Sequence, residues 1–113
     1  MDCVFCRIIN GELPSKKIYE SEHVLAFEDI QKAAPIHVLI VPKRHMESIM
    51  ELSENDVETL SELQKAIKQI AELTGVATNG FRLVSNKGTA AGQTVFHLHF
   101  HLLGGRDLEL TLA

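Results

Sequence analysis

The chain has 113 residues, of which 45% are hydrophobic and 23% are charged, and its formal net charge at pH 7 is −4. This length and composition are typical of one globular domain over residues 1–113, and the acidic balance argues against a nucleic-acid partner bound through a broad basic surface. Because no apolar run approaches the length of a membrane span and no signal-peptide pattern opens the chain, we expect a cytoplasmic protein with no membrane partner.

The first third of the chain predicts a short helix and three strands. Residues 3–9 fit one or two helical turns that end at a glycine. Residues 16–27 have the pattern of a β-hairpin, and we expect His23 to be an exposed strand residue without a role. Residues 37–41 are an apolar, β-branched run ended by Pro42, which is typical of a buried strand.

A long amphipathic helix is the clearest predicted element. Ser53 and Asp56 form a capping box in which Asp replaces Glu, and Gly75 supplies the stop. Between them, apolar residues recur at spacings of three and four, as one face of a helix requires. This stripe consists of Val57, Leu60, Leu63, Ala66, Ile67, Ile70 and Leu73. We expect the stripe to pack on a sheet, and polar residues such as Glu58 and Glu62 to be solvated.

Two further strands complete the predicted elements. Residues 81–85 form a fourth strand, residues 86–92 form a loop rich in small residues, and residues 95–103 form a fifth strand. Strands outnumber helices, and most connections between strands are short. The sequence therefore predicts an α+β fold, with a five-stranded antiparallel sheet, one long helix and a short N-terminal helix.

Three histidines alternate with apolar residues over residues 97–101, in the order His97-Leu98-His99-Phe100-His101. Alternation with period two puts the three imidazoles on one face of a strand and the apolar side chains on the other face. Imidazoles have pKa values near neutrality, so they bind metals or anions, shuttle protons or act as nucleophiles. A purely structural role is a poor explanation for three in succession.

The loop that precedes these histidines resembles a phosphate-binding loop. Residues 88–94 contain two glycines, small side chains and two hydroxyl groups, which allow backbone N–H groups to approach a ligand closely. Asn86 offers a further side-chain donor. His37 begins a different strand, where it either joins the other imidazoles or serves only as a structural residue at the strand end; the spacing favours neither.

The pair Cys3 and Cys6 has C-x-x-C spacing, which fits a zinc site, a redox pair or two free thiols. In a reducing cytosol, free or metal-bound cysteines are more common than a disulfide. A structural zinc needs four ligands, and His45 and His97 are the candidates for the other two.

Residues 92–106, with the sequence GQTVFHLHFHLLGGR, resemble the signature of the histidine triad (HIT) family. Residues 5–9, 25–30 and 34–45 also resemble that family, in the same order, so the resemblance covers almost the whole chain. The ending at residues 104–106 is similar to that of the nucleotide-binding phosphoramidase (HINT) branch. The dinucleoside polyphosphate hydrolase branch usually has a proline there, and the nucleotidyl transferase branch replaces the third histidine with glutamine.

The resemblance implies a purine nucleoside phosphoramidase, which hydrolyses the P–N bond of an AMP- or GMP-linked amine without a catalytic cofactor. It implies that His99 is the nucleophile and that His101 and His37 stabilise the phosphoryl charge. Thr94 matches a residue that hydrogen-bonds the phosphate or the leaving group, and Asp29 matches the carboxylate that holds the ribose. The implied apolar slot around the purine nucleoside consists of Phe5, Ile8, Phe27, Ile30 and Leu39. The implied phosphate shell consists of Asn86, Gly92, Gln93 and the backbone near Val95.

Some family members carry a zinc ion at positions that match Cys3, Cys6, His45 and His97. The resemblance therefore implies a structural Zn²⁺ that ties the N-terminal segment to a strand end. It also implies a two-fold homodimer through the long helix and the adjacent strand. The tail, residues 107–113, differs from the Trp-Pro-type ending of well-known members. In the implied dimer the tail approaches the partner's site, so the resemblance does not indicate which leaving group is preferred.

Three alternatives remain open from the sequence alone. A dinucleoside polyphosphate or nucleotidyl-ester hydrolase would use the same histidines. A non-catalytic nucleotide-binding regulator would keep the pocket without turnover, and a zinc-binding module would use the histidines as metal ligands. The slot residues are apolar and recognise shape more than base edges, so they indicate neither the physiological substrate nor a preference between adenine and guanine.

Overall fold

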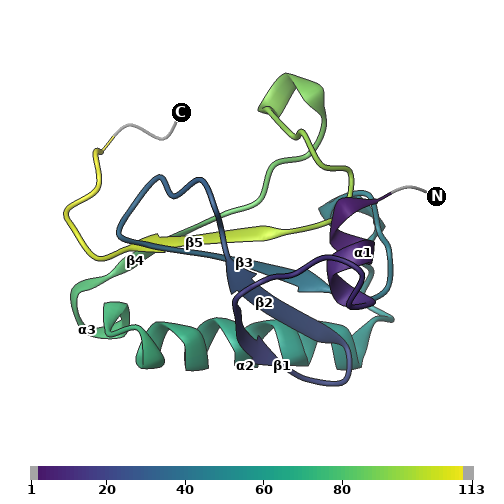
Figure 1. The fold of residues 1–113 in the computed structure, drawn as a ribbon, viewed down its shortest axis with the longest axis horizontal. Coiled ribbons are helices and arrows are strands. Elements are labelled where there is room, and N and C mark those ends of the chain that lie inside the picture. Colours follow the sequence, from purple (N-terminus) through teal and green to yellow (C-terminus); the bar gives the residue numbers. More distant parts are fainter. Residues whose placement is uncertain (1–2, 111–113) are drawn as a thin grey trace.

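The computed structural model of the chain describes residues 3–110 and has a five-stranded antiparallel sheet with a long helix along one face (Figure 1). The strand order is β1-β2-β3-β5-β4. The elements are α1 (Val4–Ile9), β1 (Lys17–Glu20), β2 (Val24–Glu28), β3 (Ile36–Pro42), η1 (Ile49–Glu51), α2 (Val57–Leu73), α3 (Val76–Asn79), β4 (Phe81–Val84), η2 (Thr89–Ala91) and β5 (Phe100–Gly104). The predicted α+β fold is confirmed.

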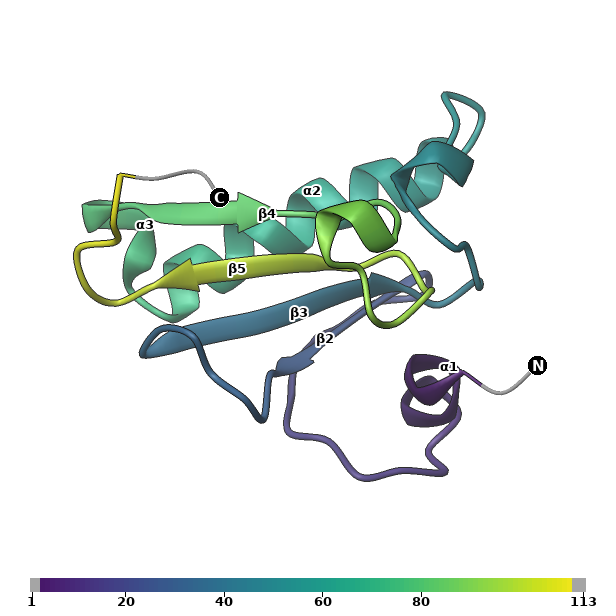
Figure 2. The same ribbon diagram turned by 90° about the horizontal axis from the view of Figure 1, so that it is seen from above.

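Alternation along β2 and β3 gives the sheet two buried faces, since successive side chains of a strand point to opposite sides. Ala26 and Ile40 belong to the core cluster under α2, which also contains Ile70. Leu25 and Leu39 belong to a second, smaller cluster that packs against α1. α1 therefore lies across the sheet from α2, as the view from above also shows (Figure 2).

Helix α2 has a different N-terminus from the one that its sequence predicts. Asp56, rather than Ser53, is the N-cap residue, and a carboxylate oxygen of Asp56 accepts the N–H of Ser53 at 2.9 Å. At the other end, Gly75 has a φ of 84°, a left-handed conformation that glycine adopts without steric cost. Among the described residues, no helix has the length and apolar character that crossing a membrane requires.

The apolar stripe of α2 packs on the sheet only in part. Leu63, Ala66 and Ile70 are buried, as expected, whereas Val57, Leu60 and Leu73 are exposed. Helix α2 contacts β1, β2 and β3, and its buried residues share one core cluster with residues of β2, β3 and β5. The buried residues of the helix are Thr59, Leu63, Ala66, Ile70 and Ala71.

The fifth strand starts later than predicted, at Phe100 instead of residue 95. β5 pairs with β3 up to the partners Ile40 and Phe100. Pro42 at the end of β3 has no N–H group, so the ladder cannot be extended on that side. The residues before Phe100 instead make other contacts, and the N–H of Leu98 donates to the carbonyl of Met46 at 2.6 Å. His97 and His99 therefore precede the strand.

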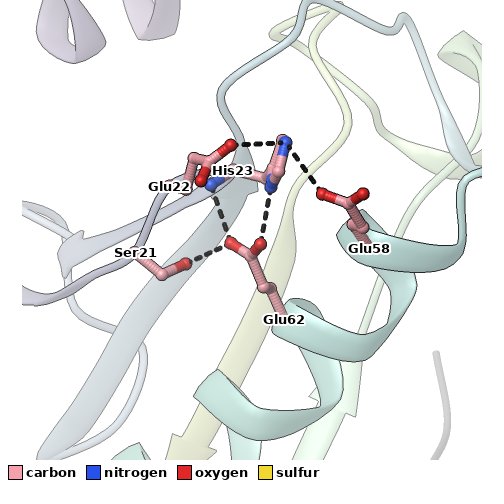
Figure 3. Close-up of polar contacts among 5 residues, drawn as sticks. All are labelled: Ser21, Glu22, His23, Glu58 and Glu62. Carbon is pink, nitrogen blue, oxygen red and sulfur yellow. Dashed lines mark hydrogen bonds and ion pairs between the residues drawn. The ribbon is translucent and has the colours of Figure 1, made fainter.

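The expectations for His23 and Glu62 are wrong. His23 lies in the turn before β2, where a single carboxylate of α2, Glu62, binds it (Figure 3). That carboxylate accepts the backbone N–H of His23 at 2.7 Å and the hydroxyl of Ser21 at 2.6 Å, and its second oxygen lies 2.5 Å from His23 Nδ1. These contacts join the β1–β2 turn to α2. Sequence spacing gives no signal for them, because the partners are far apart in the chain.

Candidate active site and metal centre

His99 lies in the segment before β5 and is almost fully buried. Its Nδ1 is 2.7 Å from the carbonyl oxygen of His97. Because a carbonyl only accepts, Nδ1 carries the proton, and Nε2 of the neutral ring keeps a free lone pair. The hydroxyl of Ser85 donates to the carbonyl of His99 at 2.8 Å and fixes its backbone. In the neutral ring, Nε2 is therefore the nitrogen with an available lone pair.

His37 joins the other imidazoles through a chain of hydrogen bonds. The backbone N–H of Ala33 donates to His37 Nδ1 at 3.0 Å, so Nε2 carries the proton of the neutral ring. That Nε2 donates to His101 Nδ1 at 2.9 Å. The proton of His101 is therefore on its own Nε2. The rings of His99 and His101, whose centroids are 5.0 Å apart, thus present a lone pair and an N–H group, respectively.

Burial keeps two of these imidazoles neutral. It lowers the pKa of His37, although the carboxylate of Asp29, 3.3 Å from His37 Nε2, opposes the shift. Burial lowers the pKa of His101 to about 4, and the nearby His99 and His37 add to the effect. Both side chains are therefore uncharged at neutral pH, as the hydrogen-bond chain requires.

A cavity of about 640 Å³ contains all of the predicted slot residues. This volume suits a small-molecule ligand. The edge of the Phe5 ring contacts His99, with the ring centroids 5.0 Å apart, so the cavity wall adjoins the active-site histidines. Ile30 is at the rim, where it is 96% exposed. The predicted residues that line the cavity are Phe5, Ile8, Phe27, Asp29, Ile30, Leu39 and Val95.

Asp29 also caps the turn that follows β2. One carboxylate oxygen accepts the N–H of Gln31 at 2.9 Å, and the other is the oxygen that faces His37. The carboxylate therefore lies between the cavity and the chain of imidazoles.

The side chain of Gln93 is engaged within the protein. Its amide oxygen accepts the N–H of Gly88 at 2.8 Å, and its amide nitrogen donates to the carbonyls of Glu47 at 2.6 Å and Val95 at 3.1 Å. Through these three contacts, Gln93 holds the loop in shape. Gly92, with a φ of 87°, makes the turn of this loop.

Asn86 and Thr94 stand at the two ends of that loop. Asn86 is half-buried just after β4, and Thr94 is exposed. Thr94 lines a second cavity of about 460 Å³, which shares Val4 and Val95 with the larger cavity. Thr94 is therefore an exposed residue of the second cavity, next in sequence to Val95, which lines both cavities.

The four predicted metal ligands meet at the N-terminus of α1. The ligand atoms of Cys3, Cys6, His45 and His97 all lie within 4.8 Å of one another. Cys3 Sγ is 3.4 Å from His97 Nδ1, and Cys6 Sγ is 3.4 Å from His45 Nδ1. Tetrahedral zinc with ordinary bond lengths needs S···N separations of about 3.5 Å.

The protonation of His97 also suits a metal. Its Nε2 donates to the carbonyl of Pro42 at 2.8 Å, so Nδ1 presents a lone pair to the two sulfurs. Burial, together with the hydrogen bond with Cys3, raises the pKa of Cys6 to about 11, so a cation is needed to hold the thiolate at neutral pH. The four residues fit a structural zinc ion in geometry and in chemistry.

Comparison with known proteins places this chain among relatives of the same size. The model of the HIT domain family matches residues 10–108. The chain belongs to the HIT domain family. A HIT family hydrolase from Clostridium thermocellum has a TM-score of 0.94 to this structure and 51% identity, over 99% of this chain and 97% of that one. An uncharacterized HIT-like protein of Synechococcus elongatus is 43% identical over 95% of this chain and 93% of its own length. The purine nucleoside phosphoramidase of Escherichia coli is 38% identical over 99% of this chain and 94% of its own length.

In this HIT protein, sequence reasoning missed groups that position the histidines. Ser85 holds the backbone of His99, and the N–H of Ala33 sets the protonation of His37. Arg106 donates to the carbonyl of Ala33 at 3.1 Å and so fixes the loop that carries this N–H. Ser85 and Ala33 have no chemical signature in the sequence. Arg106 belongs to the family signature, but nothing in the signature indicates its partner.

Proposed function

We propose that this HIT protein is a hydrolase that cleaves the P–N bond of purine nucleoside 5′-phosphoramidates, such as an AMP-linked amine. The observation that carries the proposal is the fixed protonation of two adjacent imidazoles. His99 has its free lone pair on Nε2, and His101 has an N–H group on Nε2. A nucleophile beside a preorganised donor is what attack on a phosphoryl group requires. The 38% sequence identity to the purine nucleoside phosphoramidase of Escherichia coli supports this substrate class.

The chemistry then follows in two steps. His99 Nε2 attacks the phosphorus, and a new P–N bond forms as the P–N bond of the substrate, whose nitrogen takes a proton from solvent, breaks and a neutral amine leaves. The bonds exchanged are of the same kind, so this step is close to isoenergetic. Water then attacks the nucleotidyl-histidine and loses a proton to solvent, which releases the nucleoside monophosphate and restores His99. His101 Nε2–H stabilises the charge that develops on the phosphoryl oxygens.

The cavity supplies the binding part of the proposal. Its apolar wall, which includes Phe27 and Leu39, receives the purine, and Asp29 accepts the ribose hydroxyls. The phosphate lies toward the loop that ends at Thr94, whose hydroxyl is exposed. The slot residues are apolar and recognise shape more than base edges, so we propose that AMP and GMP derivatives both bind.

The test is hydrolysis of an AMP-linked amine by wild-type protein and by His99→Ala, with AMP affinity measured on both. We expect turnover in the wild type and its loss in the variant, which still binds AMP. AMP binding without wild-type turnover would overturn the proposal in favour of a nucleotide-binding regulator. Faster turnover of a diadenosine polyphosphate would favour the alternative hydrolase, and loss of zinc from His99→Ala would favour a metal-binding module.

The proposal includes a structural Zn²⁺ held by Cys3, Cys6, His45 and His97, whose ligand atoms are already gathered. Zinc bound there supplies no chemistry to the phosphoryl group and ties α1 to the end of β3. Metal analysis of the purified protein tests this part. We expect one zinc per chain and its loss in Cys6→Ser, and a metal-free native protein would contradict it.

The proposal also includes a homodimer, in the cytoplasm. β4 is an edge strand of the sheet, and its Phe81 and Leu83 are both 40% exposed. Leu60 of α2 is exposed as well. Edge strands with apolar side chains are sites of pairing, and a second copy covers them symmetrically. We expect light scattering after size-exclusion chromatography to give the mass of a dimer for the wild type and that of a monomer for Leu83→Lys. A monomeric wild type would contradict the dimer.

A further inference from the structure

The candidate metal centre and the candidate nucleotide cavity share the short helix α1. Phe5 lies between the two cysteines in sequence and lines the cavity. Its ring contacts His99 edge-on, at an interplanar angle of 87°, and contacts Phe27 with the ring centroids 5.6 Å apart. The residue that separates the metal ligands thus touches both the proposed nucleophile and the opposite wall of the cavity.

A second connection runs through His97. Its side chain is fully buried, with Nδ1 toward Cys3 and Cys6 and Nε2 bound to Pro42. Its backbone carbonyl accepts the proton of His99 Nδ1. One residue therefore supplies both a metal-binding nitrogen and the acceptor that leaves His99 Nε2 unprotonated. A displacement of His97 would change both.

Helix α1 has only six residues, too few to be stable by itself. Inside the protein, it is held by the small apolar cluster that includes Phe5 and Leu39, and by the contacts of the two cysteines with His97 and His45. A bound metal replaces these thiol–imidazole contacts with stronger bonds and so fixes the position of Phe5.

We propose that a metal ion bound by Cys3, Cys6, His45 and His97 acts on the nucleotide site, with Phe5 as the positioning residue that connects the two. The metal holds Phe5 against His99 and completes the apolar wall of the cavity. Zinc and nucleotide therefore bind cooperatively. The part of this inference that concerns turnover rests on the proposed function, whereas the part that concerns binding does not.

Binding measurements test the inference without turnover. AMP affinity is measured by calorimetry on the zinc-loaded protein and on the protein treated with a chelator, and zinc affinity is measured with and without AMP. We expect zinc to tighten AMP binding by about fivefold or more, and AMP to tighten zinc binding by the same factor, since coupling is reciprocal. Equal AMP affinity with and without zinc overturns the inference. Loss of the far-UV circular dichroism signal on chelation also overturns it, because zinc would then hold the whole fold.

Phe5→Leu tests the connecting residue, since it keeps all four ligands and an apolar side chain but removes the ring. We expect it to retain one zinc per chain, while the coupling factor between zinc and AMP falls toward one. Nitrogen NMR of His99 should show the Nδ1–H tautomer in both zinc-loaded proteins, because the His97 carbonyl that sets this tautomer is unchanged. The matched control is Ile9→Val, because Ile9 lies in the same helix but does not line the cavity. We expect the coupling factor between zinc and AMP in this variant to equal that of the wild type. An unchanged coupling factor in Phe5→Leu overturns the role of Phe5. Coupled binding without wild-type turnover overturns the proposed function alone.

Discussion

The protein places histidines in two opposite environments. His37 and His101 pack against each other in the candidate active site, where burial lowers the pKa of both, that of His101 to about 4. His23 lies in the β1–β2 turn and faces carboxylates (Figure 3). The hydrogen bond with Glu62 raises the pKa of His23, and nearby Glu22 and Glu58 add to the effect.

The comparison shows that the surroundings decide which form of an imidazole the protein uses. In the active site, neutral rings offer a lone pair and an N–H group in fixed positions. At the turn, the hydrogen bond with Glu62 raises the pKa of His23 and so favours the protonated ring, which binds this carboxylate of α2. One residue type is therefore kept neutral in the candidate active site and attaches a turn to α2 in the other region.

The largest effect is expected from replacing one histidine in each region. His99→Asn removes the nucleophile, so we expect kcat to fall on the order of a thousandfold or more. His23→Asn, on the far side of the sheet, should leave kcat unchanged. Steady-state hydrolysis of an AMP-linked amine measures both. A comparable loss of kcat in His23→Asn would break the division between the two regions.

Thr94 sharpens the active-site side of the comparison. If its exposed hydroxyl binds the phosphoryl group, Thr94→Ala removes one preorganised donor and lowers kcat by about 10²–10³-fold. Thr94→Ser keeps the hydroxyl and is the control, with kcat near that of the wild type. Equal kcat values for the alanine and serine variants would show that the hydroxyl takes no part.

Much of this fold follows from local sequence patterns. The α2 helix, its glycine stop and the strand at residues 37–41 have periodicity and turn residues that act over a few positions. The predicted start of β5, at residue 95, was wrong. The true start depends on Pro42, which lacks an N–H group and lies far from residue 95 in the chain. The exposure of Val57 and Leu60 depends on which strands α2 covers, and a helical pattern contains no such information.

The candidate site likewise contains residues that the sequence indicated and residues that only the fold reveals. Spacing and family resemblance indicated the histidines, the cysteines and the slot residues, because side-chain chemistry identifies them. The N–H of Ala33 and the hydroxyl of Ser85 act through backbone positions that only the fold brings together. The partnership of His23 with Glu62 also depends on how the turn meets α2, so no local pattern predicts it.

A smaller effect, on stability, is expected at the turn. Glu62→Ala removes the acceptor of Ser21 and His23, so we expect the free energy of unfolding to fall by about 1 kcal/mol, a value that allows for solvent exposure. Glu58→Ala is the matched control on the same helix, since Glu58 lies 3.7 Å from His23 and is largely exposed, and we expect almost no change. Urea unfolding measures both. AMP affinity should be unchanged in each variant, and a drop in Glu62→Ala would contradict the separation of the two regions.

The smallest effect is a dependence on pH. The pKa of His23 is raised from 6.5, so its contribution to stability is complete below pH 6.5 and is lost as pH rises through the higher value of the folded state. Hydrogen bonds with Ser21 and then His23 lower the pKa of Glu62 to about 2, so its contribution is present above pH 4.5 and is lost as pH falls toward 2. The difference in the free energy of unfolding between wild type and His23→Gln should therefore be largest between pH 4.5 and pH 6.5. A difference that grows above neutral pH would contradict this sign.

The most direct test of the contrast is a proton NMR titration of the histidine rings, assigned with the variants His23→Asn and His101→Asn. We expect His23 to titrate above pH 6.5, His37 to titrate below pH 6.5, and His101 to titrate near pH 4. Titration of His101 at or above 6.5, or of His23 below it, would contradict the claim that burial and carboxylates divide the histidines into a neutral active-site group and a charged structural one.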